Sequence, residues 1–221
     1  MHFSVKNLID LKEKVNKKIS ELDFKNYCPK IIAVSKTFSL SNIQPLINYG
    51  HLDYGENKVQ EAVDKWSEIK KKNPNINLHM IGKLQTNKVK LAVKLFDFIH
   101  SVDSIKLAKK ISDEQKKNNK KPKIFIQINI GNESQKSGIN PMELYEFYNN
   151  CINDLNLDIK GIMCLPPNDN NGDFYFKKMS ELIQKISVNE LSMGMSNDYL
   201  EAFNSGATFL RIGSKIFGSR N

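Results

Sequence analysis

The stretch Ile31-Ile32-Ala33-Val34-Ser35-Lys36 decides between the two folds that suit this chain. Four apolar residues and a serine predict a buried strand, and a lysine follows directly where that strand ends. A dinucleotide-binding fold would continue here with Gly-x-Gly-x-x-Gly, but the chain continues with Lys36-Thr37-Phe38. The first strand therefore favours a barrel, and a doubly wound open sheet remains the alternative.

Seven further runs of β-branched or apolar residues follow, and the segments between them carry apolar residues at helical spacing. A first helix is expected over residues 4–22. The expected strands are residues 31–35, 51–54, 78–81, 98–101, 124–130, 159–164, 190–195 and 209–212. Eight strands alternating with helices predict an α/β fold, a single (β/α)8 TIM barrel. No Gly/Ser-rich linker divides the chain, so we expect one domain over residues 1–221.

Composition indicates a cytoplasmic globular protein. The 221 residues are 40% hydrophobic, which suffices for a core without disulfides. The cysteines Cys28, Cys151 and Cys164 are widely spaced and suit neither a disulfide scaffold nor a metal site. The N-terminus has no apolar run typical of a signal peptide, and no stretch reaches the about 18 apolar residues of a membrane span. We therefore expect a protein without a membrane partner.

The net charge of +9 comes almost entirely from lysine. Lysine clusters lie at the ends of helical segments, without interleaved aromatic residues that could stack on bases. These clusters are residues 70–72, 109–110, 116–117 and 120–121. A solvated surface explains them, so we expect no nucleic-acid partner, although a lysine-rich nucleic-acid binder stays among the alternatives. The two arginines are Arg211 and Arg220, so a planar, always charged group occurs only near the end of the sequence.

Active groups of a (β/α)8 barrel lie at the carboxyl ends of its strands, and Lys36 is placed there. Burial and neighbouring cations at such a position lower the pKa of an amine and make it a nucleophile. This suits a Schiff base with an aldehyde. Lys83 and Lys136 are the other lysines expected at the same end of the barrel.

Two turns near the end of the sequence offer backbone amides to an anion. Ser196 follows the seventh expected strand, and Gly213 and Ser214 follow the eighth. Turns after strands seven and eight are where barrels commonly bind phosphate. Together with Lys36 they suit a ligand with an aldehyde and a phosphate, and pyridoxal 5′-phosphate (PLP) is the cofactor that fits best.

The same segments carry a resemblance to a known family. The motifs are Ala33-Val34-Ser35-Lys36, Gly55-Glu56-Asn57, Gln60-Glu61, His79-x-Ile81-Gly82-x-Leu84-Gln85-x-Asn87-Lys88, Ser101-Val102-Asp103, Asn129-x-x-x-Glu133-x-x-Lys136-x-Gly138, Gly161-x-Met163, Leu191-Ser192-Met193-Gly194-Met195-Ser196-x-Asp198 and Arg211-Ile212-Gly213-x-x-Ile216-Phe217-Gly218-x-Arg220. In this order and spacing, residues 31–220 resemble the pyridoxal phosphate homeostasis protein family. The sequence departs from the family pattern at Lys58, Leu78 and Met80, where aromatic residues are usual.

The resemblance implies a barrel of the PLP-binding type, similar to the N-terminal domain of alanine racemases. Lys36 is then the lysine that forms the internal aldimine with PLP. The remaining implied roles are phosphate binding by Ser196, Gly213 and Ser214, a contact of Arg211 with the pyridine nitrogen, and a ring pocket lined by Asn57, Met80 and Met195.

Several nearby residues have a structural interpretation beside a functional one. His79 suits either the core or the cofactor's surroundings, and Ser192 points either into the barrel or toward phosphate. Met193 and Met195 are suited to core packing as well as to ligand contact. Glu133 and Lys136 form an ion pair, or Lys136 provides a second amine at the barrel mouth.

Arg211 guides the expected function. A guanidinium donates a hydrogen bond to a pyridine nitrogen without readily protonating it, so the ring stays a weak electron sink. The sequence ends at Asn221, so we expect no second domain to supply the tyrosine that racemases use. We therefore expect a monomeric carrier, not an enzyme, that holds PLP as a reversible lysine aldimine within PLP homeostasis and supplies PLP-dependent apo-enzymes. The alternatives are a low-activity amino-acid racemase and a lysine-dependent aldolase.

Overall fold

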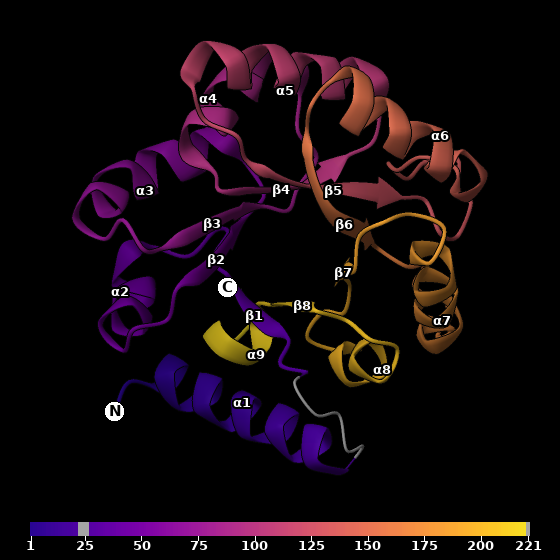
Figure 1. Cartoon of the computed structure of the whole chain (residues 1–221). Coiled ribbons are helices and arrows are strands. Elements are labelled where there is room, and N and C mark those ends of the chain that lie inside the picture. Colours follow the sequence, from indigo (N-terminus) through magenta and orange to yellow (C-terminus); the bar gives the residue numbers. More distant parts are fainter. Residues whose placement is uncertain (22–26, 220–221) are drawn as a thin grey trace.

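The computed structural model describes residues 1–21 and 27–219 and places eight parallel strands in a closed barrel (Figure 1). The strands are β1 (Lys30–Val34), β2 (Asp53–Glu56), β3 (Asn77–Met80), β4 (Phe98–Val102), β5 (Lys123–Ile128), β6 (Asp158–Cys164), β7 (Glu190–Ser192) and β8 (Phe209–Ile212). Neighbouring strands pair in sequence order, and β8 closes the barrel against β1. The predicted (β/α)8 barrel is confirmed, and the open sheet is excluded.

Helices surround the barrel on its outer side (Figure 1). They are α1 (Phe3–Glu21), α2 (Leu40–Asn48), α3 (Val59–Lys72), α4 (Val89–Leu95), α5 (Ile105–Asn118), α6 (Leu144–Asn149), α7 (Gly172–Ile183), α8 (Tyr199–Asn204) and α9 (Ser214–Phe217). Shorter helical turns are Thr86–Lys88, Pro141–Glu143 and the π-helical Asn150–Asp154. Residue 22, the expected end of the first helix, and Arg220 lie outside the described residues. None of the helices described is long and apolar enough to cross a membrane.

Strands β1 and β3 end one residue earlier than the sequence predicts. Strands β5 and β7 end two and three residues earlier, and each of these two has a local reason. Strand β7 ends at Ser192 because Gly194 has a φ of +85°, a left-handed conformation that a strand cannot contain. Strand β5 ends at Ile128 because the side chain of Asn129 binds the backbone of Glu133 through both its oxygen and its nitrogen, at 3.1 and 2.8 Å. The chain therefore leaves the sheet in ordered turns at the carboxyl ends of the strands.

The barrel interior is packed with side chains. Its apolar residues are Ile32, Phe98, Phe125, Met163 and Phe209. A larger apolar layer lies between the strands and the helices, and it contains the fully buried Trp66. The prediction that Trp66 is a core residue is confirmed. All three cysteines are free thiols: Cys28 is exposed, and Cys151 and Cys164 are buried.

Candidate functional site

A cavity of about 530 Å³ opens at the carboxyl ends of the strands. Seven of the eight residues predicted to bind a cofactor line it: Lys36, Asn57, Met195, Ser196, Arg211, Gly213 and Ser214. They follow or end β1, β2, β7 and β8, which are distant in sequence and adjacent around the barrel. The structure therefore brings the predicted residues together, and their binding of a ligand stays a prediction.

Met80 is the exception and corrects the sequence analysis. Its side chain is 1% exposed and belongs to the apolar layer between strands and helices, with Leu78. Successive side chains of a strand point to opposite faces, so Met80 points outward when His79 points inward. Ile81, the next residue, lines the cavity in its place.

The end of β1, directly before Lys36, is held by a buried cluster of polar side chains. One carboxylate oxygen of Glu56 accepts hydrogen bonds from the Ser35 hydroxyl at 2.8 Å and from the Trp66 indole at 2.9 Å. The ammonium group of Lys65 reaches the same oxygen at 3.0 Å and the carbonyl of Ser35 at 2.9 Å. The backbone that presents Lys36 is therefore anchored to both β2 and α3.

The residue after Lys36 is anchored as well. Thr37 has a φ of +68°, an unfavourable conformation for a residue with a branched side chain. Its backbone amide donates to Glu61 Oε1 at 2.7 Å. Burial raises the pKa of Glu61, but this hydrogen bond and the nearby Lys65 together outweigh it and keep this pKa below its ordinary value. An ionised Glu61 thus stabilises the sharp turn that carries Lys36.

Close backbone contact between two loops places Asn57 at the cavity. A Cβ atom on Gly82 would lie 2.4 Å from the carbonyl oxygen of Asn57, so only glycine fits there. The loops after β2 and β3 therefore touch, and Asn57 and Ile81 line the same wall.

Arg211 is the buried cation of the site. It is 3% exposed, and its two terminal nitrogens donate to the Ser192 hydroxyl at 2.9 Å and the Cys164 carbonyl at 2.8 Å. Burial lowers its pKa, while Cys164 and Asp198 oppose the shift. A guanidinium stays charged in proteins, and the acceptors that Arg211 binds within the described part of the chain, the Ser192 hydroxyl and the Cys164 carbonyl, carry no charge. The cavity wall thus carries a positive charge with spare donors.

The turns after β7 and β8 are linked by Ser196. Its hydroxyl accepts hydrogen bonds from the amides of Gly213 and Lys215 at 3.3 and 3.4 Å. Among the described residues, no acceptor is recorded for the backbone amides of Ser196 and Ser214. These two amides and two hydroxyls form a group of donors suited to an anion such as phosphate.

The other two candidate lysines are not at the cavity. Lys83 is exposed, and Lys36 is the one lysine among the described residues that line the wall. Lys136 forms an ion pair with Glu133 at 2.5 Å and donates to the carbonyl of Pro166 at 3.1 Å. The structural interpretation of the Glu133–Lys136 pair is therefore confirmed.

The structure also shows where the residues lie for which the sequence allows both a structural and a functional interpretation. Ser192 and His79 are fully buried, and Ser192 bonds to Arg211 from inside the barrel. Met193 belongs to the core, whereas Met195 is 42% exposed and lines the cavity.

Several wall residues were not predicted. They are Val34, Ile81, Leu165, Asn168, Asn197 and Asp198. Leu165 and Asn168 belong to a loop rich in proline and asparagine, a composition that signals a turn and carries no sign of a ligand site. Asp198 stands within a quoted motif and could have been selected from its position beside Ser196.

The chain is similar to known proteins over nearly its whole length. The family described as alanine racemase, N-terminal domain, matches residues 13–221. A protein of Haemophilus influenzae named pyridoxal phosphate homeostasis protein is 36% identical over 226 residues, covering 97% of this chain and 95% of the relative. A protein of Aquifex aeolicus with the same name is 37% identical over 202 residues, covering 87% and 88% of the two chains.

A solved structure shows the same fold. The structure of PipY from Synechococcus elongatus with PLP bound has a TM-score of 0.78 and 31% sequence identity to this chain. The match covers 92% of this chain and 100% of PipY.

Proposed function

Since the chain belongs to the pyridoxal phosphate homeostasis protein family, we propose that it binds PLP in the cavity at the carboxyl ends of its strands. The observation that carries this proposal is the wall of that cavity, where one lysine, one buried guanidinium and the amide-rich turns of Ser196 and Ser214 meet. A volume of about 530 Å³ is within the usual range for small-molecule sites. The cofactor bound to PipY supports the same assignment.

Each predicted wall residue has a role in this proposal. Ser196, Gly213 and Ser214 hold the phosphate with their amides and hydroxyls. Arg211 donates a hydrogen bond to the pyridine nitrogen, and Asn57 and Met195 line the ring pocket. Met80 has no role, because its side chain lies outside the barrel.

The bond to the cofactor is reversible in this proposal. The neutral amine of Lys36 attacks the aldehyde carbon, a C=N bond forms, and one water molecule leaves; hydrolysis reverses the reaction. Covalent retention with slow release suits a protein that stores a reactive aldehyde and supplies it to apo-enzymes.

The residues of the cavity suit binding of the cofactor better than catalysis with it. Arg211 provides no readily transferred proton, so a bound pyridine ring stays a weak electron sink. Racemisation also needs acid–base groups on both faces of the substrate. Among the residues that the structure describes, Lys36 and Asp198 are the acid–base groups on the cavity wall, and no Tyr, His or Cys lines it. We therefore propose a carrier without robust catalysis. The proposal keeps the sequence-based expectation that this carrier is a cytoplasmic monomer with a single domain over residues 1–221.

The visible spectrum of the protein tests this function. Purified protein incubated with PLP should show the absorption band of a lysine aldimine, and borohydride reduction should fix the cofactor on Lys36, as located by peptide mass spectrometry. Lys36→Ala should lose the band and remain folded. Lys83→Ala and Lys136→Ala are matched controls that should keep it. A full-strength, reducible band in Lys36→Ala would contradict the assignment.

A racemase is the second candidate, favoured by the match to the alanine racemase N-terminal domain. Alanine racemisation by PLP-loaded protein should stay near the rate of free PLP. Turnover at enzyme-like rates would replace the carrier with the enzyme. Reactivation of a PLP-dependent apo-enzyme by the loaded protein tests the delivery step separately.

A further inference from the structure

A continuous line of hydrogen bonds crosses the interior of the barrel from Arg211 to Asp53. Arg211 Nη1 lies 2.9 Å from Ser192 Oγ, which lies 2.9 Å from His100 Nδ1. His100 Nε2 lies 3.0 Å from His79 Nδ1. His79 Nε2 lies 3.0 Å from Asp53 Oδ1. The line therefore joins a cation at one end of the barrel to a carboxylate at the other.

Burial favours the neutral form of both histidines in this line. Burial lowers the pKa of His79, although the hydrogen bond to Asp53 opposes the shift. Burial lowers the pKa of His100 well below its ordinary value, and the neighbouring His79 and Arg211 act in the same direction. Burial raises the pKa of Asp53, but the hydrogen bonds from His79 and Asn77 outweigh it and keep this pKa below its ordinary value.

When both histidines are neutral, the charges at the two ends fix the direction of every hydrogen bond in the line. A carboxylate only accepts, so His79 carries its hydrogen on Nε2 and leaves Nδ1 as an acceptor. His100 must then donate from Nε2 and accept at Nδ1 from the Ser192 hydroxyl. The oxygen of Ser192 accepts from Arg211, which can only donate. All donors thus point from the guanidinium toward Asp53.

The aromatic core holds the two imidazole rings in place. His79 stacks on Phe98 and His100 stacks on Phe125, each with ring centroids 4.3 Å apart and interplanar angles of 12° and 8°. Both histidines are fully buried. A ring nitrogen that loses its hydrogen-bond partner therefore cannot find a water molecule or rotate toward another partner. The change in its hydrogen bonding instead alters that of the next residue in the line.

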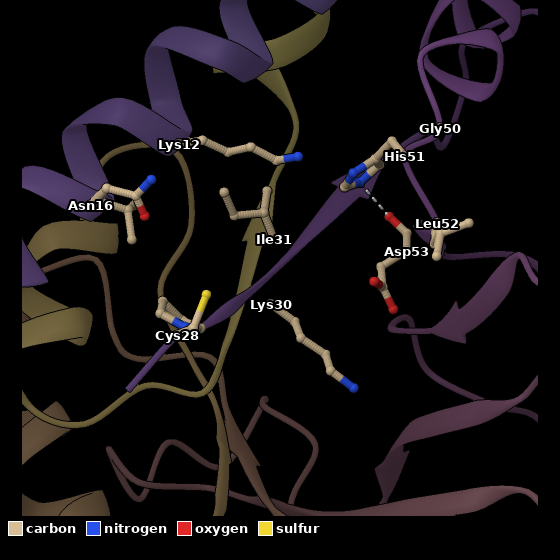
Figure 2. A pocket seen from close by; sticks show the side chains of 11 residues that line it. Lys12, Asn16, Cys28, Lys30, Ile31, Gly50, His51, Leu52 and Asp53 are labelled. Atoms are coloured by element: carbon tan, nitrogen blue, oxygen red, sulfur yellow. Dashed lines mark hydrogen bonds between the residues drawn. The ribbon is translucent and has the colours of Figure 1, made fainter. Parts of the chain in front are cut away.

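The Asp53 end of the line is open to solvent. Asp53 lines a second pocket of about 540 Å³, where α1 faces the starts of β1 and β2, and Lys12 and His51 also lie there (Figure 2). Its side chain is 16% exposed, and Oδ2 has no protein partner recorded among the described residues. The pocket around Lys36 lies at the carboxyl ends of the same strands. The line therefore connects two pockets at opposite ends of the barrel.

We propose that Asp53, His79, His100 and Ser192 are positioning residues for Arg211, and that the state of Asp53 in the amino-end pocket controls how firmly Arg211 holds the cofactor. The part concerning the cofactor rests on the function proposed above. When Asp53 cannot accept a hydrogen bond, His79 and His100 can both move their hydrogen to Nδ1. The oxygen of Ser192 then faces donors from both His100 and Arg211, and its own hydrogen loses its acceptor. The contact that orients the guanidinium is weakened as a result.

The tautomers of the histidines test the line without any cofactor. The chain has four histidines, so nitrogen NMR of histidine-labelled protein is simple to interpret. His79 and His100 should both be neutral and protonated on Nε2. Asp53→Leu should move at least one of them to the Nδ1 tautomer. Asp53→Asn keeps an acceptor oxygen and should keep the tautomers of the wild type.

Cofactor retention tests the coupling to the other pocket. Asp53→Leu should weaken PLP binding about tenfold and shift the visible band of bound cofactor, and Asp53→Asn should restore both. Asp97→Leu is the matched control at the same end of the barrel, because Asp97 binds Lys70 and the amide of Leu78 outside the line. It should lower stability and leave the band unchanged.

A second variant protects the test against misfolding. Ser192→Ala interrupts the line next to Arg211 and should also weaken retention about tenfold, with a small change in side-chain volume. Wild-type tautomers and wild-type affinity in Asp53→Leu or Ser192→Ala would overturn the proposal. If Asp97→Leu lost as much affinity for PLP as Asp53→Leu, the line would only stabilise the fold and the proposed coupling would be wrong. If the wild type bound no PLP, the proposed function would fail, and tautomers other than the two assigned would refute the line by themselves.

Discussion

The ammonium group of Lys65 lies 3.0 Å from the carboxylate of Glu56, which is fully buried beneath the turn that carries Lys36. This ion pair joins α3 to the end of β2, and the hydrogen bond from Lys65 to the Ser35 carbonyl extends it to β1. A nucleophile at a strand end needs a fixed backbone, and these contacts supply it.

Lys65→Met should therefore destabilise the fold and loosen the turn at Lys36. Removing one partner of a buried ion pair leaves an uncompensated charge, here on Glu56, and costs about 3–5 kcal/mol. Urea unfolding measures this loss. Lys71→Met is the control, because its pair with Glu68 is exposed and should contribute little to stability. Equal losses in the two variants would show that the buried pair has no special role.

Ser196→Ala combined with Ser214→Ala should weaken PLP binding. Each change removes a hydrogen bond to a charged group, which is worth roughly 1.5–3 kcal/mol, or about ten- to a hundredfold in affinity. The backbone amides remain, so binding should be weakened without being abolished. Equilibrium dialysis measures the change, with the exposed Ser134→Ala as control. Unchanged affinity would mean that phosphate binds elsewhere.

Gly82→Ala should displace the loop that carries Asn57. The added methyl group would lie 2.4 Å from a backbone oxygen that cannot move independently, so we expect a loss of about 1–3 kcal/mol in stability and weaker cofactor binding. Gly172→Ala is the control, because its methyl group would meet no backbone atom: it would lie 2.9 Å from the flexible end of Glu201 and 3.4 Å from the ring of Phe176. Thermal unfolding and the aldimine band are the two measurements, and a Gly82→Ala protein with both unchanged would refute the close contact.

Arg211→Glu should change the chemistry of bound cofactor more than its binding. A carboxylate beside the pyridine nitrogen favours its protonated form and strengthens the electron sink. Arg211→Glu should therefore exchange the α-proton of alanine in heavy water faster than the wild type does. The two proteins are compared after the aldimine band has shown that they hold equal amounts of cofactor. Arg211→Gln, which also removes the cation but adds no charge, should not gain this activity; a similar gain there would exclude the carboxylate as the cause.

Acid should destabilise the protein through its buried histidines. Burial, opposed by Asp53, lowers the pKa of His51 to about 4. Between pH 6.5 and 4 the unfolded chain therefore binds a proton at this residue that the native state does not, and stability falls as the pH falls. The contribution of His51 reaches up to about 3 kcal/mol. The free energy of unfolding, measured with urea across this pH range, should depend less steeply on pH in His51→Gln than in the wild type. An equally steep dependence on pH would contradict the assignment.

The sequence by itself determined the architecture and most of the cavity wall. Runs such as residues 31–35 alternate with helical segments, and parallel strands joined in this way close into a barrel. The carboxyl ends of such strands always meet at one face. Lys36, Ser196 and Arg211 could therefore be expected at a single site without knowledge of any contact between them.

Only the tertiary structure decided which way individual side chains point and what they meet. Along a strand the faces alternate with every residue, so an error of one position exchanges Met80 for Ile81 at the cavity. The line from Arg211 to Asp53 joins residues from five strands, and Ser192 and His100 are 92 positions apart. Contacts of this kind depend on strand register and on packing inside the barrel, and neither leaves a local pattern in the sequence.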